Sequence, residues 1–171
     1  MKNFLICMLM LLPLIVFSQD AESKCKELGV EFPKLTEPVA NYVHVVRVGN
    51  LLFLAGKGPT QEDGTLITGK IGQDLSVEEG YKAARQTGIM QLAVLKNELG
   101  DLNKVSRIVK VLGMVNSTAE FTDHSQVMNG YSDLMVEVFG EKGKHARSSV
   151  GMCSLPFNIA VEVEMIVEVH E

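Results

Sequence analysis

Several residue types on which particular functions depend are scarce or absent in this 171-residue chain. Tryptophan is absent, aromatic residues make up only 6% of the sequence, and acidic residues outnumber basic ones, which gives a formal net charge of −5. Nucleic acid binding relies on basic patches that neutralise phosphates and, for single strands, on aromatic side chains that stack on bases. The composition therefore predicts that nucleic acid is not a partner.

Residues with the spacing of metal ligands or of a catalytic triad are also lacking. The four histidines are dispersed along the chain, at His44, His124, His145 and His170, and the cysteines do not form a closely spaced pair. Zinc sites are usually built from ligands that are close in sequence. No serine, histidine and aspartate stand in an order that identifies a triad. We therefore expect no metal site and no serine nucleophile.

Hydrophobic residues, in contrast, are plentiful, at 46% of the chain. There is no internal repeat and no low-complexity linker, so the length suits one domain with a substantial core. We expect this domain to cover residues 38–171. Residues 19–37 are charged and contain Pro33, so they are predicted to form an N-terminal arm with a helical turn from Ala21 to Leu28.

The first 18 residues have the pattern of a secretory signal. An apolar run from Phe4 to Phe17 follows one lysine, is interrupted by Pro13, and is short for a membrane-spanning helix. We therefore predict a signal peptide over residues 1–18, with cleavage near Ser18. The mature protein is expected to be secreted or periplasmic, with no stable membrane insertion after the signal is removed.

Signal cleavage would remove Cys7 and leave two cysteines in an oxidising compartment. Cys25 lies in the polar arm, whereas Cys153 lies in an apolar segment, where a small buried thiol is the ordinary explanation. Whether the two form a disulfide stays open.

The hydrophobic pattern predicts an α+β fold. Ser76 and Glu79 have the spacing of a capping box for a helix that ends near Leu99, and a second helix is expected from about Thr122 to Gly140. The expected strands are Val39–Val48, Leu51–Ala55, Leu66–Lys70, Val105–Val115, a strand around Arg147, and Val161–Val169. The order βββαβαββ fits two helices packed on one face of a mixed sheet.

The region from Arg147 to Glu164 is the best candidate for a functional site. Small and apolar residues follow Arg147, so its guanidinium is expected at the mouth of a largely apolar surface, where pairing with a carboxylate is strong. In the last strand, Glu162 and Glu164 fall on the face opposite to the valines, and either could approach Arg147 if the two strands come together. A surface salt bridge is the alternative explanation of this pattern.

Three short motifs in this region stand in a characteristic order: Ala146-Arg147-Ser148, Leu155-Pro156 and the alternating Val161–Glu164. With these motifs, the chain from Pro38 to Glu171 resembles the Rid family (the YjgF/YER057c/UK114 group, also labelled endoribonuclease L-PSP). Its longer branch is matched further by Gly69–Gln86, Leu99–Ser117 and Gly130–Gly151. The resemblance implies a chorismate-mutase-like α+β fold and a homotrimer whose clefts between subunits bind small carboxylic acids.

The resemblance also implies roles for individual residues. Arg147 is expected to hold the substrate carboxylate, and Glu162 to position the water that attacks an imine. Ser149 stands where the family usually has a cysteine, and is expected to offer its backbone N–H to the substrate. Tyr42 and Gly56 correspond to a ligand-facing tyrosine and to a glycine of the site.

The pattern around these last two residues departs from that of the family, because Asn41 and Lys57 replace other residues. Without the resemblance, Tyr42 is a strand tyrosine with a solvated hydroxyl, and Gly56 is an ordinary glycine at the end of a strand.

Three functional hypotheses remain. The first is a deaminase that needs no cofactor and hydrolyses a 2-imino acid to a 2-oxo acid and ammonia. The second is an exported protein that binds a small carboxylic acid in the same cleft without chemistry, which export favours because reactive enamines arise mainly at cytoplasmic enzymes. The third is a purely structural trimer.

Overall fold

The computed structural model describes residues 20–36, 38 and 40–170. The predicted signal peptide, residues 1–18, lies outside the described residues. Over the described ranges, none of the helices combines the length and the apolar character that a membrane span requires.

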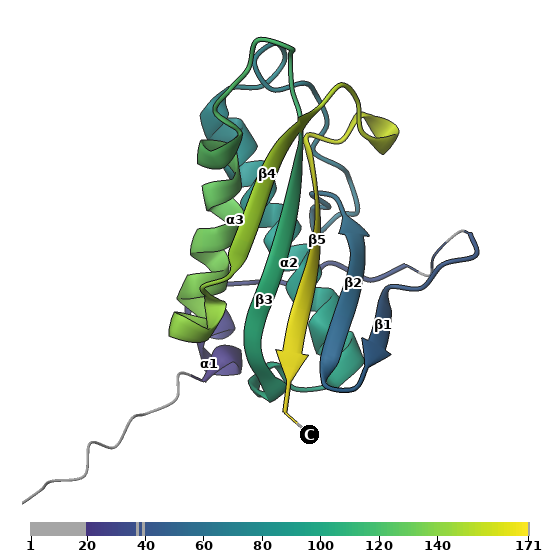
Figure 1. Cartoon of the computed structure of the whole chain (residues 1–171), viewed down its shortest axis with the longest axis vertical. Coiled ribbons are helices and arrows are strands. Elements are labelled where there is room, and N and C mark those ends of the chain that lie inside the picture. The colour runs from purple at the N-terminus through teal and green to yellow at the C-terminus, as the bar shows by residue number, and fades with distance from the viewer. Residues whose placement is uncertain (1–19, 37, 39, 171) are drawn as a thin grey trace, which may run out of the picture.

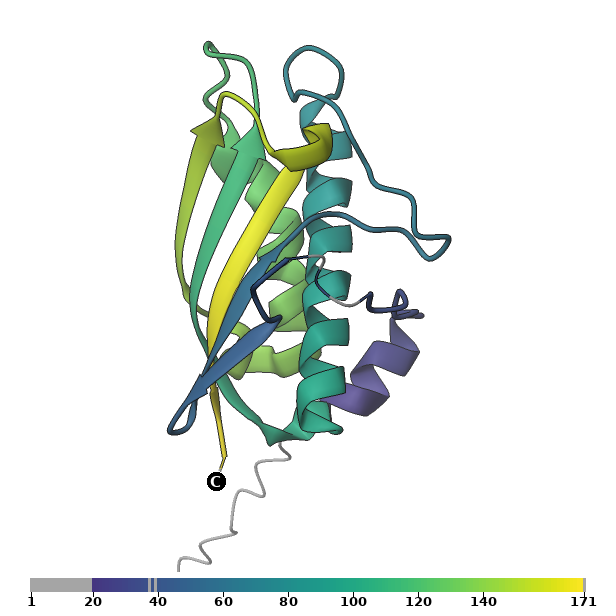
Figure 2. The same ribbon diagram turned by 90° about the vertical axis from the view of Figure 1, so that its right-hand side faces the viewer.

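Five strands form one mixed sheet in the order β1-β2-β5-β3-β4. Their bounds are β1 Val45–Val48, β2 Leu51–Lys57, β3 Val105–Asn116, β4 Ala146–Met152 and β5 Val161–Val169. Neighbouring strands are antiparallel except β3 and β4, which are parallel. The long helices α2 (Val77–Leu99) and α3 (His124–Phe139) both cover one face of the sheet, as Figures 1 and 2 show. The predicted α+β arrangement is thus confirmed.

The expected third strand is the main departure from the predicted element order. Leu66–Lys70 forms only isolated bridges, Thr60 with Leu66 and Thr68 with Ile159, so it adds no strand to the sheet. Glycines with positive φ at Gly64 and Gly69 turn this segment repeatedly and prevent a continuous ladder. The first strand is also shorter than expected, since it begins at Val45 and not at Val39.

Helix α2 begins and ends as its sequence predicts. The Ser76 side chain accepts from the backbone N–H of Glu79, whose carboxylate accepts in return from the Ser76 N–H, and Gly100 ends the helix in the left-handed conformation. An apolar stripe of α2 packs into the core through Ala84, Gly88, Leu92, Leu95 and Leu99, all buried. The burial of this stripe holds α2 against the sheet.

The two long helices approach each other closely. A Cβ placed on Gly130 of α3 would collide with the carbonyl oxygen of Tyr81 in α2. Polar contacts flank this point: the Tyr81 hydroxyl donates to Asp133 at 2.9 Å, and Arg85 pairs with Glu137 at 2.7 Å. Because Gly130 has no side chain, the helix backbones can come this near.

The N-terminal arm contains the predicted helical turn, α1 (Ala21–Glu27), which lies outside the two long helices (Figure 2). Glu22 ties it down by accepting from Lys96 at 2.8 Å and from the backbone N–H of Leu102 at 2.8 Å. Three 3₁₀ turns complete the fold at Leu102–Lys104, Gly140–Gly143 and Pro156–Asn158.

The cysteines do not have the environments expected from the sequence. Cys25 lies on the buried side of α1, and this burial raises the pKa of its thiol to about 11. Cys153 was expected to be a buried strand residue, but it lies exposed just after β4 has ended at Met152. Both thiols are free.

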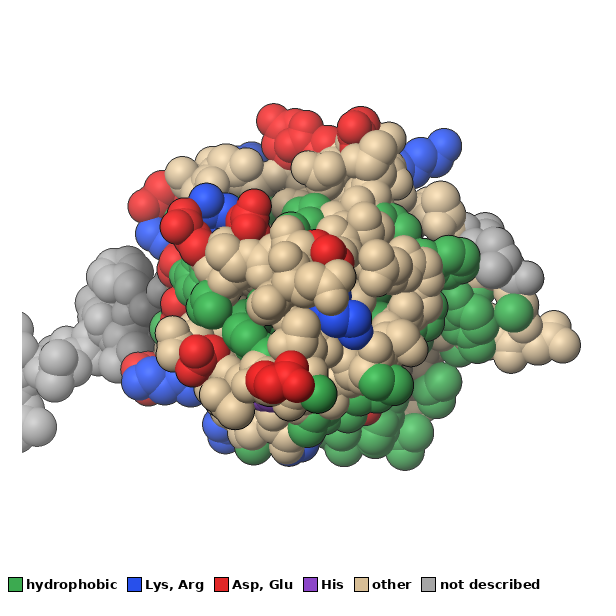
Figure 3. Space-filling model, turned by 90° about the horizontal axis from the view of Figure 1, so that it is seen from above, with side chains coloured by type: hydrophobic (Ala, Val, Ile, Leu, Met, Phe, Trp, Pro, Cys, Tyr) green, Lys and Arg blue, Asp and Glu red, His purple; other side chains and the backbone are tan. Residues whose placement is uncertain are grey.

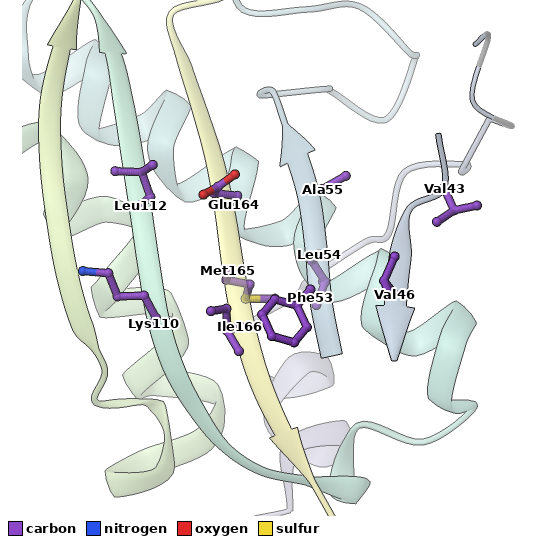
Figure 4. Close-up of a pocket in the computed structure, with 10 residues that line it drawn as sticks. All are labelled: Val43, Val46, Phe53, Leu54, Ala55, Lys110, Leu112, Glu164, Met165 and Ile166. Carbon is purple, nitrogen blue, oxygen red and sulfur yellow. The ribbon is translucent and has the colours of Figure 1, made fainter. Parts of the chain in front are cut away.

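The face of the sheet away from the helices is open and partly apolar. It carries a cavity of about 370 Å³, and Figure 4 shows the residues that line it, which lie on β1, β2, β5 and β3 except for Val43, just before β1. Val46, Phe53 and Ile166 lie side by side across this face, with Lys110 and Glu164 beside them. Seen from above, hydrophobic side chains gather at the lower right, on the side of β1 and β2 (Figure 3). We call the sheet face that carries Val46, Phe53, Lys110, Glu164 and Ile166 the open face.

The tight helix contact gives a test of the fold. Replacing Gly130 with Ala should destabilise the protein by about 1–3 kcal/mol of unfolding free energy, because the added methyl group meets backbone that cannot rotate away. Gly88→Ala is the matched control in α2, where the new methyl group meets side-chain atoms of Leu134, Met135 and Tyr131 and not backbone. Its strain is offset by a gain in helix propensity of about 1 kcal/mol. Equal losses in the two variants, measured by urea unfolding, would contradict this account.

Candidate functional site

Arg147 lies on β4, at the edge of the sheet, with its side chain directed to the helix-covered face. Its guanidinium donates to the Ser132 hydroxyl at 2.8 Å, to the Asn129 side-chain oxygen at 3.1 Å and to the backbone carbonyl of Ser125 at 3.2 Å. All three acceptors belong to α3. The helix therefore holds the arginine head in one orientation beside the sheet edge.

The positive charge of Arg147 has no carboxylate partner within ion-pair distance in the part of the chain that the structure describes. Partial burial lowers the pKa of Arg147, and the more distant Asp133 partly offsets this shift. The group stays charged, since guanidinium loses its proton only at very high pH. A fixed, partly desolvated cation with neutral neighbours is suited to bind an anion.

A hydrogen-bond chain behind Arg147 links it to His145. Nδ1 of His145 lies 2.6 Å from the Gly143 carbonyl oxygen, and Nε2 lies 3.0 Å from the Ser132 hydroxyl. A carbonyl can only accept, so Nδ1 carries the hydrogen and Nε2 accepts from Ser132. Burial lowers the pKa of His145, the hydrogen bond to the Gly143 carbonyl partly opposes this shift, and the charge of Arg147 lowers the pKa further. The imidazole is thus held neutral, and Ser132 can present its lone pairs to Arg147.

Ser149 lies two residues beyond Arg147 on the same face of β4. Its hydroxyl is buried without a hydrogen-bond partner. Its neighbour across the parallel pair is Gly113, over which the Met128 side chain lies. An unsatisfied buried hydroxyl costs about 1–3 kcal/mol of stability, so the Ser149 side chain is energetically unfavourable in this environment.

Glu162 lies on β5 and belongs to the other face of the sheet. Its neighbours Val161 and Val163 are fully buried toward the helices, whereas Glu162 is half-buried on the open face. Its carboxylate rests against Gly56, where a Cβ would overlap the carboxylate oxygen. Burial raises the pKa of Glu162, the nearby Glu164 raises it further, and Lys57 partly opposes the shift. A carboxylate with a raised pKa is a better proton acceptor.

An irregularity in the pairing of β2 with β5 creates the place for that carboxylate. The register shifts between Leu54 and Lys57, and Gly56 lies within the shift. Gln91 of α2 is fully buried beneath it and donates to the carbonyl oxygens of Ala55 at 3.1 Å and Val163 at 2.7 Å. The Gln91 side chain thus donates hydrogen bonds to backbone carbonyl oxygens at the register shift, where the regular pairing of the strands is interrupted.

The structure does not bring Arg147 and Glu162 together within one chain. β3 lies between β4 and β5, and the partner of Glu162 across β3 is Val150, reached through Met114. Arg147 points to the helices and Glu162 to the opposite face. The expectation that Glu162 or Glu164 approaches Arg147 by direct pairing of their strands is therefore wrong for a single chain.

The remaining predicted residues divide between the two faces. Ser149 accompanies Arg147, and Gly56 accompanies Glu162. Tyr42 lies before β1 and not in a strand, with 52% of its surface exposed. Three polar residues near these groups were not identified from the sequence as parts of the site: Gln91, His145 and Ser132. Helical position alone could have pointed to Gln91, as a polar residue on the buried side of α2.

No group of three or more histidine, cysteine, aspartate or glutamate side chains that could hold a metal ion occurs among the described residues. The chemistry that the site can perform with its own groups is the binding of an anion at Arg147 and proton transfer at Glu162.

Comparisons with known proteins agree with this fold. A family model described as "YjgF/chorismate_mutase-like, putative endoribonuclease" matches residues 22–169. Protein TCP17 of Trypanosoma cruzi is 41% identical over 157 residues, which cover 91% of this chain and 98% of that protein. The crystal structure of the protein Atu1372 from Agrobacterium tumefaciens aligns with a TM-score of 0.79 at 43% identity, over 88% of this chain and 94% of the other.

A more distant relative has a name that states a reaction. The 2-iminobutanoate/2-iminopropanoate deaminase of Dermatophagoides farinae is 28% identical over 142 residues, which cover 82% of this chain and 95% of that protein. The mixed sheet covered by helices on one face defines the structural class as α+β, and the sequence matches identify the family within that class. The chain belongs to the YjgF/chorismate mutase-like family, so the resemblance found in its C-terminal motifs is confirmed.

The lowered pKa of His145 predicts a dependence of stability on pH. Between this lowered pKa and the usual value of about 6.5, the unfolded chain binds more protons than the folded one. The free energy of unfolding should therefore fall as the pH decreases through this window. His145→Gln, which cannot titrate, should lose this part of the dependence while both proteins share the carboxylate titration at lower pH. Identical pH profiles of thermal unfolding would contradict the assignment.

Proposed function

We propose that the mature protein is an exported homotrimer that binds small 2-oxo and 2-imino carboxylic acids in clefts between subunits. The observation that carries this proposal is the state of Arg147, whose partly buried charge is oriented by three neutral acceptors and lacks a carboxylate partner among the described residues. A ligand carboxylate would supply the missing negative charge in a bidentate pair. Export rests on the sequence of residues 1–18 alone.

The separation of Arg147 from Glu162 favours a site shared between two subunits. In this arrangement, Arg147 and Ser149 of one subunit hold the carboxylate, and Tyr42, Gly56 and Glu162 of the next subunit surround the rest of the ligand. The open face supports assembly, because exposed apolar strand residues such as Val46 and Phe53 are commonly covered by another chain.

The chemistry that fits these groups is hydrolysis of an imine without a cofactor. Arg147 would fix the substrate carboxylate, and Glu162 would accept a proton from the water that attacks the imine carbon. The raised pKa of Glu162 supports this role, because a general base works best when its pKa lies nearer to the working pH. The products are a 2-oxo acid and ammonia.

The relatives support this reaction more than ribonuclease activity. One of them is named as a deaminase for 2-imino acids. The family description also mentions an endoribonuclease. The net charge of −5 opposes binding of a polyanion, because it gives no general basic field. Binding of a stable carboxylate without chemistry is the alternative, and it would suit an exported protein.

Variants of the two charged residues separate these alternatives. Arg147→Ala should weaken binding of a 2-oxo acid by about 2–4 kcal/mol, because a charge-assisted contact is lost. Glu162→Gln should abolish ammonia release from a freshly generated 2-imino acid while it changes 2-oxo acid affinity little. Titration calorimetry measures the first effect, and an ammonia assay the second.

Thermal unfolding of Arg147→Ala provides the control for folding. If the variant unfolds and the parent never binds a 2-oxo acid, Arg147 is a structural residue and the proposed site is wrong. If Glu162→Gln keeps full activity, or the parent binds without releasing ammonia, the deaminase assignment fails and the binding function remains.

The trimer has its own test. Light scattering on residues 19–171 should give three times the mass of one chain at micromolar concentration. Phe53→Glu should dissociate the assembly, because it places a charge in the centre of the open face. Phe157→Glu is the matched control, since Phe157 is 83% exposed in the turn before β5, outside that face. A parent protein that runs as a clean monomer would remove the shared cleft.

A further inference from the structure

Lys57 lies directly after Gly56, in a partly buried cluster of titratable side chains. Its Nζ is 2.7 Å from Nδ1 of His44, whose Nε2 is 2.9 Å from the carbonyl oxygen of Thr36. Since this carbonyl can only accept, the hydrogen of His44 is on Nε2. Nδ1 then accepts from Lys57, so the imidazole holds the amine in place.

The lysine shares Gly56 as a neighbour with Glu162. The carboxylate of Glu162 rests against Gly56, and it is close enough to Lys57 for the two charges to interact. Even so, no carboxylate lies within ion-pair distance of Lys57 among the described residues. Lys57 as a residue is neither fully buried nor fully exposed.

The electrostatic environment favours the uncharged forms of both groups. Burial lowers the pKa of Lys57, and Glu162 only partly offsets this. Burial likewise raises the pKa of Glu162. Desolvation of this kind is one of the ways in which proteins turn a lysine into a nucleophile for carbonyl groups.

We propose that Lys57 is a nucleophile that forms a Schiff base with the 2-oxo acids that bind in the cleft. This inference rests on the proposed function, because it requires a 2-oxo acid at the site. The Nζ lone pair attacks C2 of the oxo group and gives a carbinolamine. Its hydroxyl leaves as water after it takes a proton from the solvent, and an iminium on Lys57 remains.

The same amine can act on a 2-imino acid. Attack of Nζ on C2 of the protonated imine, followed by loss of ammonia, gives the same iminium on Lys57. Water then adds to C2 and releases the 2-oxo acid, which regenerates the free amine. The sum is imino acid plus water to oxo acid plus ammonia, with no external oxidant or reductant.

Reductive trapping on the mature protein tests the proposal, with pyruvate as the probe. Cyanoborohydride reduces an iminium to a stable secondary amine, so intact mass spectrometry counts the adducts and peptide mapping locates them. We expect one adduct per chain, on Lys57. Its yield should exceed that at exposed lysines by about tenfold for each unit by which its pKa is lowered.

Two variants sharpen the result. Lys57→Arg keeps a cation but removes the nucleophile, and should abolish the adduct. Lys110→Arg is the matched control on the open face, where Lys110 donates to Ser148 at 3.0 Å, and should keep it. Thermal unfolding shows whether both variants are folded. Peptide mapping of the adduct in the parent protein does not depend on either variant.

Adducts scattered over surface lysines, or no adduct at Lys57, overturn the proposal. Calorimetric titration with pyruvate shows which inference has failed. If pyruvate binds in a way that depends on Arg147 but forms no adduct, only the Schiff-base proposal fails, and Lys57 is a charged, structural residue. Absence of both binding and adduct removes the proposed function as well.

Discussion

The alternation of side chains along β5 is the constraint on which the candidate site depends. β5 pairs with β2 on one side and with β3 on the other, so it fixes the register of both. Its valines and Met165 are buried against the helices, whereas Glu162, Glu164 and Ile166 face away from them. A slip by one residue would bury three carboxylates, each of which would have to be desolvated. The position of Glu162 is therefore determined by the core and not by local loop structure.

The two halves of the site handle charge in different ways. Arg147 is a permanent cation, and its surroundings consist of neutral oxygen acceptors that orient it without neutralising it. In the other half, burial raises the pKa of Glu162 and lowers that of Lys57, so that it favours the neutral form of each. A small 2-oxo acid has the complementary division, with a charged carboxylate beside a neutral, polarised carbonyl carbon. In the proposed complex, binding and chemistry therefore depend on different side chains.

Local patterns in the sequence predicted much of the fold. The capping box at Ser76, the stop at Gly100 and the alternation in β5 each depend on neighbouring residues, and each is confirmed. The prediction of a third strand was wrong, because the β-propensity of Leu66–Lys70 does not show that the chain turns there and has no continuous partner strand. The prediction that Cys153 is buried was wrong for a similar reason, since β4 ends one residue before it, at Met152.

The errors within the site arise from contacts between distant segments. Strand order placed β3 between β4 and β5, which no periodicity in those strands could indicate. The roles of Gln91 and His145 likewise depend on partners 72 residues away, at Val163, and 13 residues away, at Ser132. Arg147 and Glu162 were chosen as candidate site residues because motifs in the sequence mark them. Their neighbours carry no motif, and only the fold identifies them.

A site shared between subunits would couple ligand binding to assembly. Because Arg147 and Glu162 lie on opposite faces of one sheet, a small ligand on an isolated chain would meet either the cation of Arg147 or the carboxylate of Glu162, but not both. In the proposed trimer the ligand contacts two chains at once, so each bound molecule adds its binding free energy to the association of those chains. By the same linkage, any change that weakens the open-face contacts must also weaken ligand binding, even when it lies far from Arg147. The apolar strand residues and the charged residues would then be two parts of one functional unit.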